Sequence, residues 1–275
     1  MLRLPSRLLF EVTAACNYRC PFCYCVWHEF PELAKPELDT KAWEEIIDEC
    51  AARGVRDITF TGGEATLRKD LWHLIDYARE RLPKGHLALF TNGSRMTEER
   101  IVWCKDRKIR LATSLQGLRT YGQQTGTHRT YGRTLSFIAR ASELNLPVDV
   151  SITVTKVNLD EIADVVAAAI ISNAATIQIN AVMVEGCMRS HTELALSQDE
   201  WKTAKETIQK LPDGGIPRCF SDEMLCHCRP QPDEFQRRFG EANPAPCAAG
   251  KSFGVIGPSG LFRRCLHTVE NSEWR

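Results

Sequence analysis

The sequence contains no apolar run long enough to cross a membrane, and its first residues lack the long apolar stretch of a secretory signal peptide. It also has no excess of either charge, because 35 Lys and Arg residues balance 35 Asp and Glu residues. Nucleic-acid-binding proteins usually carry a basic excess. We therefore expect a cytoplasmic protein that binds neither a membrane nor a nucleic acid.

Low-complexity tracts are absent as well, and apolar residues make up 43% of the 275 positions. That composition allows a sizeable core, and the length suits one large α/β domain with a small appendage. Cysteine, by contrast, is abundant, with twelve residues. In a cytoplasmic chain so many cysteines indicate metal binding rather than disulfides.

Three of the cysteines, Cys16, Cys20 and Cys23, lie within eight residues and follow the apolar run at 8–13. Thiolates at this density favour an iron–sulfur cluster or zinc. Three ligands leave one metal position open, as catalytic metal sites do. There are three alternatives. Half a zinc ribbon would need a second close CxxC pair, and a two-cluster ferredoxin would need a second run of cysteines. The third alternative is that these cysteines are buried core thiols.

Apolar periodicity predicts a regular alternation of strands and helices after the first strand at 8–13. Strands are expected at 55–60, 87–90, 109–114, 148–154 and 176–180, and helices at 39–54, 71–82, 97–106, 133–144 and 158–170. Capping-box spacing marks two helix starts, Asn158 with Glu161 and Ser197 with Glu200. Six strands alternating with helices predict a parallel sheet with crossover connections. We assign residues 1–211 to this barrel-like unit and residues 212–275 to a Cys-rich extension.

Polar groups follow the carboxyl ends of the first four strands, where parallel α/β folds place their functional loops. The cysteine loop follows the first strand, Gly62-Gly63-Glu64 the second, Asn92 the third and Ser114 the fourth. Taken alone, the two glycines indicate a plain strand-to-helix turn. Ser151 and Thr153 share one face of the fifth strand and are expected to point inward.

The spacing CxxxCxΦC, with Phe22 as the aromatic residue, resembles the signature of the radical S-adenosylmethionine (radical SAM) enzymes. The resemblance implies a partial (β/α)₆ barrel and a [4Fe–4S] cluster whose fourth iron chelates SAM. Reductive cleavage of SAM then gives a 5′-deoxyadenosyl radical that abstracts hydrogen from substrate. Gly62, Gly63 and Glu64 would hold the SAM amino group, and Asn92, Ser114 and Ser151 would line its pocket. Gln116 departs from the acid that many relatives carry there, which puts a proton-accepting role in doubt.

Five cysteines fall within the last 60 residues. Cys247 and Cys265 flank a predicted hairpin around residues 257–260, and this segment resembles the start of a SPASM or twitch extension. The resemblance implies auxiliary [4Fe–4S] clusters, but the later cysteines of a full SPASM domain are missing. One auxiliary cluster is possible, with Cys226 and Cys228 as further ligands. The alternative is that the upstream cysteines are free thiols.

Many members of this group modify ribosomally made peptides by crosslinking or epimerisation, and we expect this chain to do the same. The expected partners are SAM, a reductant such as flavodoxin or ferredoxin, and a precursor peptide, although no separate precursor-recognition domain is visible. The first alternative is a dehydrogenase of a small molecule, which would need the auxiliary cluster to accept an electron. The second is a non-catalytic electron carrier, which leaves the polar residues at the rim unexplained.

Overall fold

The computed structural model describes residues 4–222, 224, 233–239 and 248–268. Nine strands form one sheet in the order β7-β6-β5-β4-β3-β2-β1-β8-β9. The strands are β1 (Arg7–Glu11), β2 (Asp57–Thr61), β3 (His86–Phe90), β4 (Ile109–Ser114), β5 (Val148–Val154), β6 (Thr176–Ala181), β7 (Arg218–Ser221), β8 (Phe253–Ile256) and β9 (Phe262–Arg263). All neighbouring pairs are parallel except β8 and β9.

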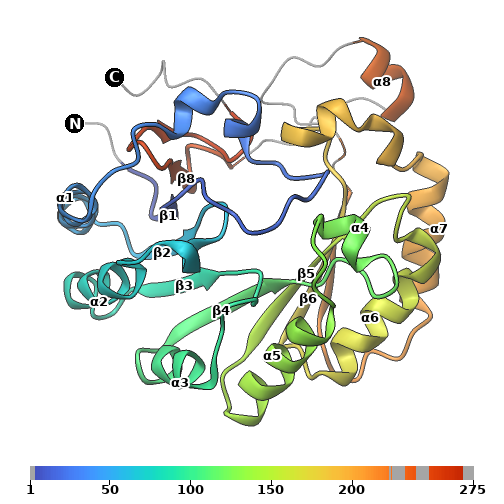
Figure 1. Cartoon of the computed structure of the whole chain (residues 1–275), viewed down its shortest axis with the longest axis horizontal. Coiled ribbons are helices and arrows are strands. Elements are labelled where there is room, and N and C mark those ends of the chain that lie inside the picture. Colours follow the sequence, from blue (N-terminus) through green and yellow to red (C-terminus); the bar gives the residue numbers. More distant parts are fainter. Residues whose placement is uncertain (1–3, 223, 225–232, 240–247, 269–275) are drawn as a thin grey trace.

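Helices connect the strands and lie around the outside of the curved sheet (Figure 1). They are α1 (Thr40–Ala52), α2 (Leu71–Arg81), α3 (Glu98–Asp106), α4 (Tyr121–Thr125), α5 (Gly132–Glu143), α6 (Ile162–Ile171), α7 (Gln198–Gln209) and α8 (Asp233–Phe239). The predicted alternation of the first six strands with helices is confirmed, and so is the barrel-type α/β class. Within the described residues no helix has both the length and the apolarity needed to cross a membrane.

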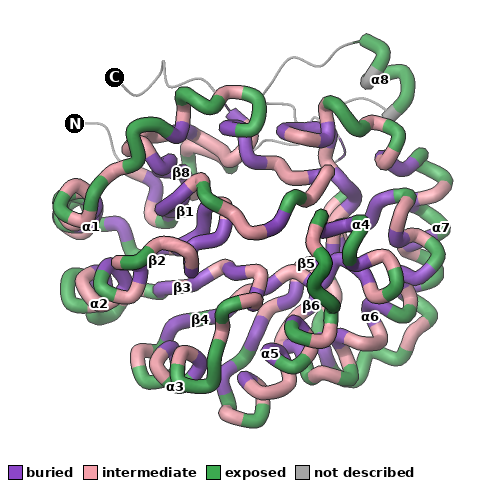
Figure 2. Tube along the Cα trace, viewed as in Figure 1, coloured by how far each residue is buried: buried purple, intermediate pink, exposed green. Residues whose placement is uncertain are grey.

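The core lies between the sheet and the surrounding helices, and buried positions alternate with intermediate ones along β1–β6 (Figure 2). Phe10 on β1 contacts Trp43 on α1 and Phe60 on β2, with ring centroids 5.2 Å and 5.8 Å apart. All three side chains are fully buried. Removing an aromatic side chain of this kind typically costs about 3–5 kcal/mol of stability. The wall that carries the cysteine loop is therefore rigidly packed.

Three strands come from the segment that we assigned to the extension. β7 adds to β6 as an unpredicted seventh parallel strand, and β8 pairs with β1 at the other side of the sheet. The predicted hairpin around residues 257–260 is confirmed as β8 and β9. The division at residue 211 stays a prediction, although these strands lie in the same sheet as the barrel.

Of the two predicted capping boxes, only that of α7 forms, where Ser197 and Glu200 exchange both hydrogen bonds. The prediction for Asn158 and Glu161 is wrong. The Asn158 side chain donates instead to the carbonyls of Gln116 and Thr153. Glu161 accepts the backbone N–H groups of residues 118–120. These two side chains are drawn into the loop after β4, because its buried backbone groups need partners.

Candidate active site

A cavity of about 300 Å³ opens at the carboxyl ends of the parallel strands. Its lining includes every residue that the sequence predicted to bind the active cluster or SAM. These residues come from the first five strands and from the loops after them. These are Cys16, Cys20, Phe22, Cys23, Gly62, Gly63, Glu64, Asn92, Ser114 and Ser151. The fold therefore brings together groups that lie up to 135 positions apart in the sequence.

The three thiols of the cysteine loop differ in environment. Burial raises the pKa of the Cys16 and Cys20 thiols above the usual value. Hydrogen bonds, first from Cys25 and then from His28, lower the pKa of Cys23. Cys25 is itself buried, and the sequence analysis had assigned it no role. Its thiol also donates to the carbonyl of Gly62, in the turn after β2, at 4.0 Å.

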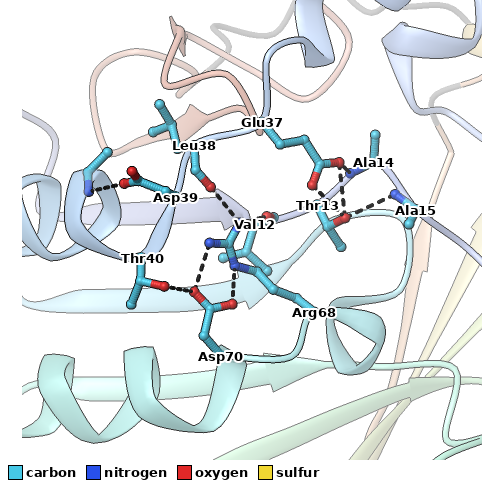
Figure 3. A network of polar contacts seen from close by, with 11 residues as sticks. Val12, Thr13, Ala14, Ala15, Glu37, Leu38, Asp39, Thr40, Arg68 and Asp70 are labelled. Carbon is cyan, nitrogen blue, oxygen red and sulfur yellow. Dashed lines mark hydrogen bonds and ion pairs between the residues drawn. The ribbon is translucent and has the colours of Figure 1, made fainter.

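The segment that leads from β1 into the cysteine loop is fixed by side chains from two other loops (Figure 3). Arg68 donates to the carbonyl of Val12 at 2.9 Å and is held by an ion pair with Asp70. Glu37 accepts the N–H of Ala14 at 2.7 Å and the hydroxyl of Thr13 at 3.1 Å. Contacts within the protein therefore hold the backbone before Cys16 in a defined conformation.

The glycines of the turn after β2 allow that turn to approach the same segment closely. A Cβ atom at Gly62, where φ is +145°, would lie 2.4 Å from the carbonyl oxygen of Thr13. At Gly63 it would lie 2.4 Å from the carbonyl oxygen of Ala15. The N–H of Gly63 donates to the Thr13 carbonyl at 2.8 Å. Glycine is required at both positions by this close approach, whatever ligand the cavity holds.

Glu64 is buried and accepts four hydrogen bonds. Its Oε1 accepts from the backbone and hydroxyl of Thr66 and from the hydroxyl of Thr91. Its Oε2 accepts only the N–H of Asn92, at 2.7 Å. Oε2 thus accepts fewer hydrogen bonds than Oε1 and can take a further donor. A ligand ammonium group in the cavity would satisfy it.

The opposite wall of the cavity combines hydroxyl and amide side chains with apolar ones such as Val182 and Met183, and its described residues carry no charge. Asn180 donates to the hydroxyl of Ser151 at 3.0 Å, and Gln116 accepts the N–H of Thr153 at 2.8 Å. The side-chain carbonyl of Gln116, which lies just after β4, therefore binds the backbone of β5 and holds the two strands side by side. Ser221 on β7 completes this wall.

Several lining residues were not singled out from the sequence. Tyr18 and Tyr121 meet through their hydroxyls at 3.3 Å, and burial raises the pKa of Tyr18. Met183 reaches the cavity from the loop after β6. His267 reaches the cavity from the segment after β9, with its ring 5.7 Å from that of Tyr24. Spacing gave no signal for these contacts because they depend on the packing of distant segments.

Two of the five C-terminal cysteines, Cys219 and Cys265, belong to the described residues. Cys265 lies just after β9, and its sulfur accepts the N–H of His267 at 3.5 Å. Cys226, Cys228 and Cys247 lie outside the described residues. Their predicted role as ligands of an auxiliary cluster stays a prediction.

The fold and cavity together define a barrel enzyme with a thiol-lined cofactor site. The family model of the radical SAM superfamily matches residues 10–169, which is more than half of the chain. The chain belongs to this superfamily. Its members use a [4Fe–4S] cluster together with SAM.

The chain is similar to several known proteins. It is 32% identical over 166 residues to the sporulation killing factor maturation protein SkfB of Bacillus subtilis, covering 59% of this chain and 39% of SkfB. It is 28% identical to the PqqA peptide cyclase of Bradyrhizobium diazoefficiens, covering 98% of this chain and 68% of the cyclase. The fold resembles Streptococcus suis SuiB bound to its precursor peptide SuiA, with a TM-score of 0.73, 17% identity, and coverage of 100% of this chain and 62% of SuiB. The chain thus spans less than two thirds of SkfB and SuiB.

The residues of the cavity fit the cofactors of the family. Three thiols on one loop supply three ligands, and Glu64 keeps an acceptor position for an ammonium group. Within the described part of the chain, no three Cys, His, Asp or Glu side chains converge closely enough to hold a metal ion. A [4Fe–4S] cluster needs no such convergence, because each thiolate binds a different iron. The raised pKa values of Cys16 and Cys20 mean that cluster binding would release protons from these two thiols.

Proposed function

We propose that this enzyme modifies a ribosomally made peptide, forming a crosslink or epimerising a residue. The proposal is supported by the similarity to SkfB and to PqqA peptide cyclase and by the likeness of the fold to SuiB in complex with a precursor peptide. The chemical character of the cavity supplies the argument from this chain itself.

The cavity wall formed by β4–β7 carries hydroxyl and amide groups, and the described lining of the cavity includes no Lys or Arg. A nucleoside triphosphate or a substrate rich in carboxylates needs cations that bind its charges. Hydroxyl and amide side chains instead match the donors and acceptors of a peptide backbone and of uncharged side chains. This observation carries the proposal of a peptide substrate.

In this proposal the chain's own residues divide the work. Cys16, Cys20 and Cys23 would hold the cluster, and Glu64 would accept the SAM ammonium group. When bound, the cluster and SAM supply a 5′-deoxyadenosyl radical that abstracts hydrogen. The wall with Ser151 and Asn180 would orient the peptide so that the reacting C–H bond faces SAM. Gln116 has no basic group, so any proton that the product releases must leave by another route.

Two further points belong to this proposal. The electron for SAM cleavage would come from flavodoxin or ferredoxin. The enzyme would work in the cytoplasm, because its described residues include nine free cysteines, which need a reducing compartment.

The test first searches the neighbourhood of the gene for a short reading frame and uses the peptide that such a frame encodes. The reconstituted enzyme is incubated with this peptide, SAM and dithionite, in H₂O and in D₂O, and the products are examined by mass spectrometry. A crosslink removes two hydrogen atoms from the peptide, whereas epimerisation in D₂O adds one deuterium. The variant with Cys16, Cys20 and Cys23 changed to Ala is the control. Release of 5′-deoxyadenosine with an unchanged peptide would contradict the proposal for that substrate.

A further inference from the structure

Three exposed arginines surround the outer side of the cysteine loop, and they come from three different segments. Arg19 lies within the loop itself, Arg95 follows β3 and Arg129 follows α4. Much of the stretch after α4 is exposed (Figure 2).

Hydrogen bonds show that these segments are neighbours in space. The side chain of Asn17 donates to the hydroxyl of Ser94 at 2.9 Å. The N–H of Arg19 donates to the carbonyl of Thr125 at 2.9 Å. Arg129 closes the circle by donating to the carbonyl of Ser94 at 3.4 Å. We call Arg19, Arg95 and Arg129 the arginine surface.

The arginine surface carries uncompensated positive charge. Among the described residues none of its three guanidinium groups has an ion-pair partner, although the whole chain has a formal net charge of zero. The carboxylate of Glu98, three positions after Arg95, is already paired with Arg140. The excess is therefore local, and an exposed excess of this kind attracts a partner of opposite charge.

Arg19 joins this surface to the first predicted cluster ligand. The guanidinium group of Arg19 donates to the backbone carbonyl of Cys16 at 2.5 Å. Cys16 itself is partly exposed here, whereas Glu64 and the glycine turn lie deeper in the barrel. An electron that arrives at this surface therefore has a short path to the cluster site.

We propose that the arginine surface is the docking site for an acidic one-electron carrier. The carrier would give up one electron, which the cluster takes up, so that the carrier is oxidised and the cluster reduced by one electron each. No atom or proton needs to be transferred in this step. Electron-transfer partners typically form small, transient interfaces, for which a few charges suffice. This inference rests on the proposed need for a protein reductant and is independent of the peptide substrate.

The test compares two charge-reversed double variants with the same change in net charge. In the first, Arg95→Glu and Arg129→Glu remove the outer part of the arginine surface and leave Arg19 at the cysteine loop. The matched control, Arg56→Glu with Lys251→Glu, alters exposed cations in a hollow at the opposite ends of the strands. The probe is a flavodoxin of net negative charge, whose association with the reconstituted enzyme is measured by stopped-flow at low and high salt.

The first variant is expected to associate about tenfold more slowly than wild type at low salt, because charge steering commonly changes association rates by this factor or more. The difference should largely disappear near 0.5 M salt, where screening is strong, as expected from a Debye length of only several ångströms. The control should behave as wild type does. Iron content and 5′-deoxyadenosine release with dithionite, which needs no docking, should be unchanged in both variants.

Equal slowing in both variants would overturn the proposal, since it would show a general effect of net charge. Unchanged flavodoxin association in the first variant would also overturn the proposal. This holds even if that variant loses binding of an acidic precursor peptide. All of these measurements can be made without a peptide substrate. Their outcome is therefore separate from that of the proposed peptide modification.

Discussion

The side-chain amide of Asn92 donates to the Oδ1 atom of Asn17 at 2.8 Å. Asn17 follows the first cluster cysteine, so this bond joins the cysteine loop to the turn after β3. The Oδ1 atom of Asn92 also accepts the N–H of Ser94 at 2.9 Å. Asn92 was predicted as a residue of the SAM pocket, and it does line the cavity. It has in addition a structural role toward the cluster loop.

The two roles of Asn92 can be separated by a pair of variants. Asn92→Ala removes the bond to Asn17, the acceptor of the Ser94 N–H and the side chain in the cavity. Asn17→Ala removes the bond to Asn92 and the bond to the Ser94 hydroxyl, but it leaves the Asn92 side chain in the cavity. A net hydrogen bond contributes about 0.5–1.5 kcal/mol. We therefore expect both variants to retain iron less well, and Asn92→Ala alone to bind SAM about two- to tenfold more weakly. Equal SAM affinity in the two variants, measured by equilibrium dialysis, would restrict Asn92 to the structural role.

Glu64→Gln tests the predicted contact between Glu64 and the SAM ammonium group. The change keeps the size of the side chain but removes its charge, whereas Ala would leave four buried donors without an acceptor. A hydrogen bond to a charged group contributes about 1.5–3 kcal/mol, so SAM binding should weaken about tenfold or more. Iron content should stay near that of wild type.

The control for this variant is Thr91→Val, which removes one of the internal donors to Glu64 and keeps the carboxylate charge. Its SAM affinity should change much less than that of Glu64→Gln. If the two variants bind SAM equally well, Glu64 serves only to hold the turn after β2 against β3.

Periodicity predicted the first six strands because each strand is rich in apolar residues and is followed by a helix with a clear 3.6-residue period. β7 was missed because Arg218-Cys219-Phe220-Ser221 is short and has little apolar alternation. The strand is defined by its pairing with β6, which a local pattern does not show. The predicted cluster and SAM residues gather in one cavity because all follow carboxyl ends of parallel strands. His267 and Tyr121 could not be found in this way, since their positions depend on how distant segments pack.

Glu161 is another residue whose contacts depend on the packing of distant segments. Its charge leads to a prediction for unfolding in acid. It is only 1% exposed, and burial opposes its charge. The hydrogen bonds from Thr120, Leu118 and Arg119 outweigh this effect and lower the pKa of Glu161 below the usual value. A carboxylate with a lowered pKa stabilises the fold above its unfolded-state pKa of about 4.5, and this contribution is lost as the pH falls through the folded-state pKa.

Glu161→Gln should therefore destabilise the cluster-free protein by about 1–3 kcal/mol at pH 7, because buried donors lose a charged acceptor. The gap between variant and wild type should narrow as the pH is lowered below about 4. Urea unfolding at a series of pH values measures both quantities. The neighbouring exposed Asp160, changed to Asn, is the control and should alter stability little at any pH. A gap that is constant with pH would show that the charge of Glu161 does not matter.

The last prediction concerns the C-terminal cysteines and uses the variant with Cys16, Cys20 and Cys23 changed to Ala. This variant should release no 5′-deoxyadenosine, because no cluster remains to deliver an electron to SAM. A fully ligated [4Fe–4S] cluster needs four thiolates. Cys247 and Cys265 could supply two of them, and Cys226 with Cys228 the others.

If this auxiliary site is complete, the triple variant should still bind about four irons per chain after anaerobic reconstitution. Changing Cys265 to Ala in the same background should then reduce the iron content strongly, while Cys50→Ala, which alters a buried thiol of α1, should not. Iron near zero in the triple variant, with a circular dichroism spectrum like that of wild type, would mean that the C-terminal segment holds no cluster. A dehydrogenase mechanism that passes an electron to an auxiliary cluster would then be excluded, whereas peptide modification with the first cluster alone would stand.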